Sequence, residues 1–450
     1  MRALTYACRI NGNKMQYRRS SSTARPAICR QNVLDLVISR QDAVCRYPLR
    51  GGLGADMRAD TADVVIVGAG IYGASVAFAL ASLGISQVLV LDERFPTAGA
   101  SGRGDGILRI HYANVPEAQL AISSLDTYAN WADIVGGSCG YEPNGFLWLS
   151  GHDDVDRLSR NVDLQRSLGG LTESCTAAEV KALQPHLDVS DLGSAAYEPR
   201  GGAGSAAEAT YSLLAAAGRM GVKLCTWRPV RRLIRKKNQV TGVVTDRGNI
   251  SCSVVVLTAG AWSAPLAATA GVDLPLSPVR CCTGRLHLPP SLMGSMTFID
   301  TVSNLTFNPR SNGLAHLATR DDNHLSIVDP NNFVESVASS AGPRSVEALA
   351  ERVPLCADAP LADSWAGVDG VTPDGKAILG SVTGVSGLVL GVGGNFKGFK
   401  IAPAVGTCLA QIVIVGGSSL TDISRFALSR FETTRPQAWS PTAYASSTLA

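Results

Sequence analysis

Two glycine-rich turns carry the residues best suited to binding a charged ligand. The first, GAGIYG, places Gly68, Gly70 and Gly73 in a G-x-G-x-x-G spacing, and the second, GGNFKGFK, contains Lys397 and Lys400. In the first spacing one glycine makes a tight turn, the next lets a pyrophosphate approach backbone N–H groups, and the last lets a helix pack closely on a strand. The second turn adds positive charge just before a predicted helix.

The segments around the first turn follow the order of a dinucleotide-binding unit. VVIVG predicts a strand buried on both faces, IYGASVAFALASLG predicts a helix that Gly84 can end, and QVLVLD predicts a second strand. That strand finishes on Asp92, about twenty residues past the last glycine, where an acceptor for a ribose hydroxyl belongs. The order predicts a dinucleotide without choosing between NAD and FAD.

Apolar strand patterns recur in the middle and near the end of the chain, in SVVVLTAG and GLVLGVGG. Amphipathic helices lie between the early strands and the middle run. Short strands separated by turns lie between the middle and late runs, and they favour an antiparallel sheet. We therefore expect an α/β fold with two interleaved domains. The predicted nucleotide-binding domain comprises 58–112, 190–280 and 362–432, and the predicted substrate domain comprises 113–189 and 281–361, followed by a tail, 433–450.

Composition argues against several classes of protein. The 450 residues suffice for two domains with substantial cores, and a net charge of +3 is too small to indicate a nucleic-acid surface. No apolar run reaches the length of a membrane-spanning helix. The eleven cysteines are scattered without a C-x-x-C pair, so we expect buried thiols in a reducing compartment and no metal site.

Residues 1–57 differ in character from the rest, being rich in Arg and Ser. Three interpretations stay open: an organelle transit segment, non-native translation upstream of a start at Met57, and a disordered tail. We expect a cytoplasmic protein, or a mitochondrial one if the segment is a genuine transit sequence.

Several longer motifs make the chain similar to a known family. They are DVVIVGAGIYGASVAFALASLG with VLVLDE, GASGRGDGILR, VTGVVTDRGNISCSVVVLTAGAWSAPLA, WAGVDGVTPDGKAILG and GGNFKGFKIAPAVG. In this order they resemble the FAD-dependent D-amino-acid oxidase superfamily, within it the branch of sarcosine oxidase, glycine oxidase and the proline dehydrogenase beta subunit. The resemblance implies FAD, bound by a Rossmann-like domain of the glutathione-reductase type, with an interleaved antiparallel-sheet substrate domain.

The resemblance also assigns roles to residues. Lys400 matches a lysine that contacts the flavin and a substrate carboxylate, and Arg109, after one gap in the alignment, matches an arginine that pairs with that carboxylate; both are expected to be catalytic. The cofactor-binding residues predicted from the motifs and the resemblance are Gly68, Ala69, Gly70, Ile71, Tyr72, Gly73, Asp92, Glu93, Arg94, Ala100, Ser101, Gly102, Arg103, Val230, Ala259, Gly260, Trp262, Gly393, Gly394, Asn395, Phe396, Lys397 and Lys400.

Two positions depart from the family pattern. Sarcosine oxidases tether the flavin through a cysteine where this chain has Gly367, so we expect FAD to bind without a covalent bond. The oxidases also carry a lysine that activates oxygen, whereas the matching strand here offers Ala315 and His316. We therefore expect a dehydrogenase more than an oxidase.

Together these inferences predict an FAD-dependent oxidoreductase that oxidises the C–N bond of a small amino acid or N-methylated amine by hydride transfer to flavin N5. The expected partners are that substrate and an electron acceptor (a quinone, an electron carrier or oxygen), with a homo- or hetero-oligomer also considered. Two alternatives stay open: oxidation of a 2-hydroxy acid or polyol phosphate on the same fold, and a flavoprotein subunit that acts mainly in complex assembly.

Overall fold

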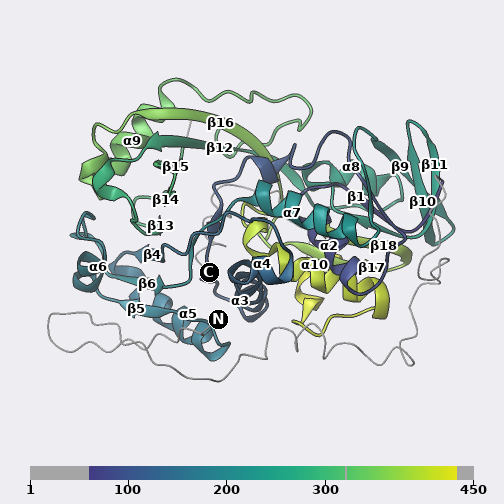
Figure 1. The fold of residues 1–450 in the computed structure, drawn as a ribbon, viewed down its shortest axis with the longest axis horizontal. Coiled ribbons are helices and arrows are strands. Elements are labelled where there is room, and N and C mark those ends of the chain that lie inside the picture. Colours follow the sequence, from purple (N-terminus) through teal and green to yellow (C-terminus); the bar gives the residue numbers. More distant parts are fainter. Residues whose placement is uncertain (1–59, 320–321, 433–450) are drawn as a thin grey trace. The chain divides into compact units, whose positions relative to one another are not determined.

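The computed structural model describes residues 60–319 and 322–432. The predicted N-terminal extension, 1–57, and the predicted tail, 433–450, lie outside the described residues, so their interpretations stay predictions. Figure 1 shows two β-sheets in the described part, each with helices packed against it.

The first sheet is the nucleotide-binding sheet that the apolar runs predict. Its parallel strands lie in the order β18, β11, β1, β2, β8, so their carboxyl ends meet at one edge. β9 and β10 extend it in antiparallel pairing with each other and with β11, and β17 pairs antiparallel with β18. The strands are β1 (Thr61–Val67), β2 (Val88–Leu91), β8 (Lys223–Cys225), β9 (Val230–Lys236), β10 (Gln239–Thr245), β11 (Gly248–Leu257), β17 (Ile378–Val382) and β18 (Val385–Val392).

Four helices share one apolar core with this sheet: α2 (Ile71–Ser82), α3 (Val115–Ala129), α7 (Ala206–Arg219) and α10 (Gly398–Val415). Small residues let them pack closely, since a Cβ at Gly406 of α10 would lie 2.5 Å from the backbone of Ser75 in α2. A second core, to which α8 (Ser263–Ala268) contributes, contains the alternate residues of the same strands.

α10 is the one helix in the described ranges that is long and apolar enough to cross a membrane, but 67% of it is buried inside the protein. It packs against α2 and α3. Burial in the core therefore explains the apolar composition of α10.

The second sheet is mainly antiparallel, as predicted, in the order β16, β12, β15, β14, β13, β4, β6, β5, with β13 and β4 parallel. Its apolar face packs against α6 (Ala177–Leu183) and α9 (Ala341–Arg352), and α5 (Val155–Ser167) lies against β5 and β6. Thr176 and Glu179 form a capping box at the start of α6. The strands are β4 (Phe146–Ser150), β5 (Glu173–Cys175), β6 (Ser194–Glu198), β12 (Ser277–His287), β13 (Thr297–Asp300), β14 (Leu305–Pro309), β15 (Leu314–Ala318) and β16 (Leu361–Val371).

The remaining elements are short. They are β3 (Ile107–Leu108), which pairs with β7 (Gly202–Ala203), the helix α4 (Trp131–Ile134), and the 3-10 turns η1 (Ala100–Gly102), η2 (His152–Asp154), η3 (Gly260–Trp262), η4 (Pro290–Leu292), η5 (Pro354–Cys356), η6 (Ile423–Phe426) and η7 (Leu428–Phe431).

The sheets depart from the predicted domain boundaries at three places. β6 and β16, which fall in the segments 190–280 and 362–432 assigned to the nucleotide-binding domain, are strands of the second sheet. α3, assigned to the substrate domain, packs with α10 of the nucleotide-binding domain. Because a single strand or helix can pack with either sheet, the sequence pattern of that element does not identify its partner. The division into domains itself stays a prediction.

Candidate functional site

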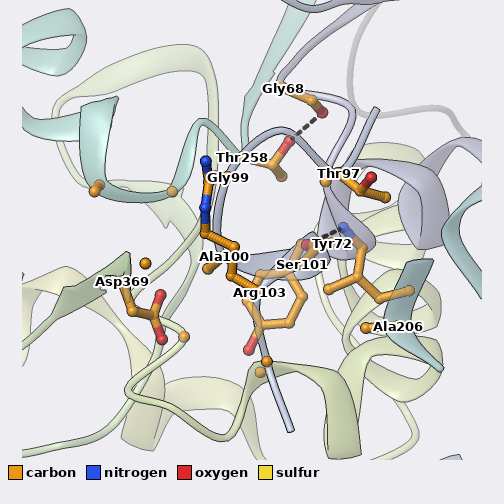
Figure 2. Close-up of a pocket in the computed structure, with 18 of the residues that line it drawn as sticks. Gly68, Tyr72, Thr97, Gly99, Ala100, Ser101, Arg103, Ala206, Thr258 and Asp369 are labelled. Carbon is orange, nitrogen blue, oxygen red and sulfur yellow. Dashed lines mark hydrogen bonds between the residues drawn. The ribbon is translucent and has the colours of Figure 1, made fainter. Parts of the chain in front are cut away.

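The glycine turn between β1 and α2 forms one end of a pocket. Gly68 has a φ of 104°, which few other residues adopt. The N–H of Ile71, at the start of α2, donates to the Ser101 hydroxyl at 3.0 Å (Figure 2). Asp92, just after β2, accepts the N–H of Ala69 at 2.7 Å. The turn therefore presents a helix N-terminus with little side-chain bulk, the arrangement that binds a pyrophosphate.

The pocket continues from this turn along the carboxyl ends of the parallel strands to the second sheet. The space that water-sized molecules can occupy inside it amounts to about 290 Å³, which lies at the lower end of the roughly 300–1,000 Å³ of most ligand pockets. The predicted residues that line it are Gly68, Gly70, Ile71, Tyr72, Asp92, Glu93, Arg94, Ala100, Ser101, Arg103, Val230, Ala259, Gly260, Trp262, Gly393, Gly394, Phe396 and Lys400.

The other predicted residues do not line the pocket: Ala69, Gly73, Gly102, Asn395, Lys397 and Arg109. Gly73 serves packing, because a Cβ there would lie 1.9 Å from the carbonyl oxygen of Gly68. Asn395 shapes the second turn, since its side-chain oxygen accepts the N–H of Thr372 at 2.9 Å and its amide donates to the carbonyl of Gly393 at 2.6 Å.

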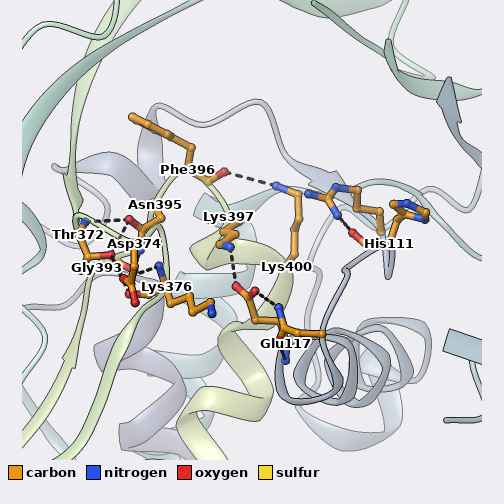
Figure 3. Close-up of polar contacts among 12 residues, drawn as sticks. His111, Glu117, Thr372, Asp374, Lys376, Gly393, Asn395, Phe396, Lys397 and Lys400 are labelled. Atoms are coloured by element: carbon orange, nitrogen blue, oxygen red, sulfur yellow. Dashed lines mark hydrogen bonds and ion pairs between the residues drawn. The ribbon is translucent and has the colours of Figure 1, made fainter. Parts of the chain in front are cut away.

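Lys397 forms an ion pair instead of facing the pocket. Its Nζ lies 2.5 Å from Oε1 of Glu117 on α3, and the two side chains are only 9% and 5% exposed. Figure 3 shows this contact beside the turn that precedes α10. The position of Lys397 does not support the predicted role in cofactor binding; the residue joins two elements of the fold.

Arg109 is enclosed by aromatic side chains. Its guanidinium lies over the ring of Tyr112 at 4.5 Å and over the ring of Trp148 at 4.9 Å, and it donates to the carbonyl of His111. The side chain is 6% exposed and does not line the main pocket. Its position therefore does not support the predicted contact with a substrate carboxylate.

Lys400 lies in the first turn of α10 and lines the pocket. Its Nζ donates to the carbonyl of Phe396 at 3.4 Å (Figure 3). Burial lowers the pKa of Lys400 to about 8, with Asp105 opposing and Arg109 reinforcing the shift. The ammonium form is therefore still the main one at neutral pH.

Asp369 is an acid in the same part of the pocket that sequence reasoning missed. Its Oδ2 accepts the N–H of Phe396 at 2.7 Å, and its Oδ1 accepts the N–H of Gly370 at 2.8 Å. Burial raises the pKa of Asp369 to about 6, while those two backbone hydrogen bonds and Lys400 oppose the rise. Strand alternation from Gly367 could have found it, since residues two apart share a face.

Tyr72, in the first turn of α2, lines the pocket with a hydroxyl that has no hydrogen-bond partner among the described residues. The residue is 7% exposed, and Figure 2 shows its ring beside Ser101 and Arg103. An unpaired buried hydroxyl is unfavourable unless a ligand or water satisfies it. Its position thus favours a polar ligand in the pocket.

Gly367 lines the pocket opposite Cys281, its cross-strand partner in β12. A Cβ at Gly367 would lie 2.9 Å from carbons of the Arg103 side chain. Arg103 donates to the carbonyl of Ala98 and pairs with Glu335 at 3.3 Å. The arginine therefore occupies the space that a larger residue at 367 would need, and Cys281 is the one thiol among the described lining residues.

His316 and Ala315 point to opposite faces of the second sheet. His316 lies opposite Arg285, on the face of β12 that carries the pocket residue Thr283. Ala315 is 0% exposed in the apolar core of the other face. Burial lowers the pKa of His316 to about 4, so the imidazole is neutral at pH 7.

The described residues fit an FAD molecule. The pocket joins a glycine turn suited to a pyrophosphate, the acid Asp92 and the unpaired hydroxyl of Tyr72 to a far end that contains Lys400. The carboxyl edge of a parallel sheet is where α/β proteins bind dinucleotides. Sequence reasoning also missed a set of uncharged lining residues near these groups, namely Thr97, Ala98, Gly99, Gly104, Gly106, Ile107, Ala206, Thr258, Leu266, Val368, Gly391, Val392, Gly398 and Phe399.

Comparison with known proteins agrees with this arrangement. The chain is 27% identical over 373 residues to 4-methylaminobutanoate oxidase (formaldehyde-forming) of Paenarthrobacter nicotinovorans, covering 81% of this chain but only 45% of that protein. It is 25% identical to sarcosine oxidase subunit beta of Rhodobacter capsulatus, covering 82% of this chain and 88% of that subunit. The fold matches the crystal structure of L-proline dehydrogenase from P. horikoshii with a TM-score of 0.76, 23% identity, and coverage of 83% and 98%.

The family described as DAO, FAD dependent oxidoreductase, matches residues 63–412. This range contains both glycine turns, both sheets apart from the first two residues of β1, and every residue that lines the pocket. The resemblance inferred from the motifs is confirmed, and the chain belongs to the DAO family of FAD-dependent oxidoreductases.

Proposed function

We propose that this protein oxidises the C–N bond of a small amine or amino acid with FAD as the hydride acceptor. The observation that carries the proposal is the single pocket that joins the glycine turn at Gly68 to Lys400 and Asp369. The relatives named for oxidation of sarcosine and 4-methylaminobutanoate support the C–N bond as the target.

FAD, when bound, would supply an acceptor for one hydride, which carries two electrons. Lys400 and the N-terminal end of α10 add positive potential at one end of the pocket, which stabilises negative charge that develops there. Asp369 holds the turn before α10 by accepting the N–H of Phe396. Because Asp369 and Lys400 titrate near neutral pH, each is suited to hold or release a proton during turnover.

An anaerobic screen tests this function. The purified holoenzyme is mixed with amines, amino acids and 2-hydroxy acids, and the flavin absorbance is followed. Bleaching by an amine or amino acid supports C–N oxidation. Bleaching by 2-hydroxy acids or polyol phosphates alone would favour the alternative oxidation on the same fold.

A yellow protein that none of these compounds reduces would favour a role in complex assembly, the kind of role that a subunit can have. One relative is itself named as a subunit, the beta subunit of sarcosine oxidase. Size-exclusion chromatography with light scattering would show whether the chain forms a homo-oligomer, and co-purification would show a hetero-oligomer.

We also propose that FAD binds without a covalent link. Glycine stands at position 367, and the Arg103 side chain fills the neighbouring space. Acid precipitation should then release all flavin into the supernatant. Flavin that stays in the pellet would contradict this, and loss of that retained flavin in Cys281→Ser would identify the attachment point.

We propose that the protein is a dehydrogenase, whose reduced flavin reacts slowly with oxygen. The sheet face that lines the pocket carries His316, which is neutral at pH 7 and offers no charge to stabilise superoxide. Stopped-flow mixing of reduced enzyme with oxygen should show slow reoxidation, with faster turnover on a quinone or dye. His316→Lys should raise the rate at which the reduced flavin reacts with oxygen. Ala315→Lys is not a suitable test, because it would place the charge in the apolar core.

A further inference from the structure

The pocket contains no arginine positioned to clamp a carboxylate on the substrate, within the described residues. Arg109 is held between the rings of Tyr112 and Trp148, outside the pocket. Arg103 and Arg94 both line the pocket, but the guanidinium of Arg103 donates to the carbonyl of Ala98 and pairs with Glu335. The guanidinium of Arg94 lies over the ring of Trp262, 5.6 Å from its centroid. An α-amino carboxylate would therefore meet Lys400 as its cation, without the bidentate geometry that arginine provides.

Two carboxylates face this same part of the pocket. Asp105, in the loop after η1, and Asp369, on β16, both line it, and both are close enough to Lys400 to influence its ionisation. Both residues are half-buried. Asp369 accepts one backbone N–H on each oxygen, which leaves a second lone pair on each oxygen for a ligand.

We propose that Asp105 and Asp369 select an amine cation that carries no carboxylate. The inference rests on the proposed C–N oxidation and narrows its substrate class. Arg109 and Lys397 also influence Lys400, but neither lines the pocket, and Lys397 is paired with Glu117. The pocket wall here therefore presents two carboxylates beside the ammonium of Lys400, which favours a cation over an acid. Apolar neighbours, Ile107 and Phe399, leave room for alkyl substituents on the amine.

Asp369 also provides an acceptor for the proton that such a substrate must lose. An ammonium ion has no lone pair to assist the departure of hydride from its α-carbon. Transfer of one proton from the substrate nitrogen to an Asp369 oxygen breaks an N–H bond, forms an O–H bond and leaves the neutral amine. The C–H electron pair then leaves as hydride to the acceptor that the proposed function supplies.

A pair of probes with the same shape and opposite charge tests this selection without turnover. tert-Butylammonium and 2,2-dimethylpropanoate both carry a tert-butyl group, and neither has a hydrogen on the carbon next to the charged group. Each is titrated into the holoenzyme, with binding followed by calorimetry and by the shift of the flavin spectrum. The expected result is that the ammonium binds at least about tenfold tighter than the carboxylate. Equal affinity, tighter binding of the carboxylate, or no binding of the ammonium would overturn the inference.

Variants then assign the selectivity to residues. Asp369→Asn should weaken ammonium binding at least about tenfold and leave the carboxylate no weaker. Because Asp369 also fixes the turn before α10, Asp105→Asn provides a second test that leaves that turn intact, and it should weaken ammonium binding as well. Asp358→Asn, which removes one negative charge from an exposed position outside the pocket, is the matched control and should change neither affinity. Unchanged ammonium affinity in both pocket variants would overturn the proposal.

The substrate inference and the proposed function fail in different ways. Rapid flavin reduction by sarcosine, glycine or proline, with no competition from tert-butylammonium, would overturn the amine selection and leave C–N oxidation standing. Failure of every amine and amino acid to reduce the flavin would overturn the proposed function, while the affinity ratio of the two probes would still be measured.

Discussion

Lys400 and Asp369 meet at the same end of the pocket from different elements, a helix and a strand. Burial shifts both of their pKa values toward neutrality, Lys400 down to about 8 and Asp369 up to about 6. The pair therefore changes charge within the pH range in which most enzymes are assayed, so measurements of pH dependence can address each residue in turn.

Binding of tert-butylammonium should weaken as the pH falls through about 6, because protonation of Asp369 removes one of the charges that attract it. Lys400, which is mainly protonated below its pKa of about 8, opposes the attraction. Calorimetry from pH 5 to pH 7.5 measures the effect. Asp369→Asn should abolish the pH dependence, and a profile identical to wild type in that variant would contradict the assignment.

Replacement of Lys400 by methionine should slow flavin reduction by the factor that corresponds to about 2–4 kcal/mol, the usual loss when one preorganised electrostatic donor is removed. The physical reason is that negative charge developing in the pocket loses its cation. Anaerobic stopped-flow measures the rate. Lys236→Met, at an exposed position on β9, is the control and should react at the wild-type rate.

The same Lys400→Met variant should change how stability depends on pH. The folded-state pKa of Lys400 is about 8, below its ordinary value of 10.5, so the unfolded chain binds the proton more tightly. Wild-type stability therefore rises relative to the variant as pH rises from about 8 to about 10.5, by up to about 1.4 kcal/mol per pH unit. Urea unfolding at several pH values checks this, and a constant difference between the two proteins would show that Lys400 is not shifted.

At the level of elements, the ion pair of Lys397 and Glu117 fastens the start of α10 to α3. Lys397→Met should destabilise the fold by about 3–5 kcal/mol, because it leaves a carboxylate buried without its cation. The double variant Lys397→Met with Glu117→Gln should recover part of that loss. Denaturant unfolding of the three proteins measures it, and equal losses in the single and double variants would exclude the pairing.

The turn between β1 and α2 separates packing from ligand binding. Gly70→Val should fold but bind little FAD, since an added Cβ meets only the Ser101 hydroxyl, at 3.2 Å, while the larger side chain enters the pyrophosphate path. Gly73→Ala should lower stability itself, because its Cβ would lie 1.9 Å from the carbonyl oxygen of Gly68. Thermal unfolding and bound flavin per chain distinguish the two effects.

Gly417→Ala is the control for these glycine variants, since Gly417 lies outside the pocket and a Cβ there would meet nothing within 4 Å. It should keep wild-type stability and bind stoichiometric FAD. Stoichiometric FAD in Gly70→Val as well would mean that the pyrophosphate does not follow the path we assign to it.

Local sequence patterns predict the helices and strands well, but they predict poorly where a single side chain points. The strands from Thr61 and Val88 and the helix between them follow from apolar runs and glycine spacing, which depend on neighbours in the sequence. Lys397 and Lys400, three residues apart, look equivalent in sequence, but one pairs with α3 and the other faces the pocket. Arg109 depends in the same way on two aromatic rings, one of them on a distant strand. Tertiary packing alone determines which groups these three side chains contact.

At the scale of the whole described chain, the pocket needs both sheets. The glycine turn and Asp92 come from the first sheet, while Thr283, Gly367 and Asp369 come from the second. A change in how the sheets pack would therefore alter the substrate end of the pocket while leaving the glycine turn intact. This separation gives family members a physical route to different substrates with one cofactor.

The position of β18 between β17 and β11 has a consequence for how the protein is made. β1 and α2 leave the ribosome early, but the strand that extends their sheet and the helix that carries Lys400 are synthesised after nearly all of the second sheet. A nascent chain thus presents its glycine turn long before the opposite wall of the pocket exists. We expect flavin to load only after translation is complete, so that cells short of riboflavin accumulate full-length, cofactor-free chains that chaperones must hold.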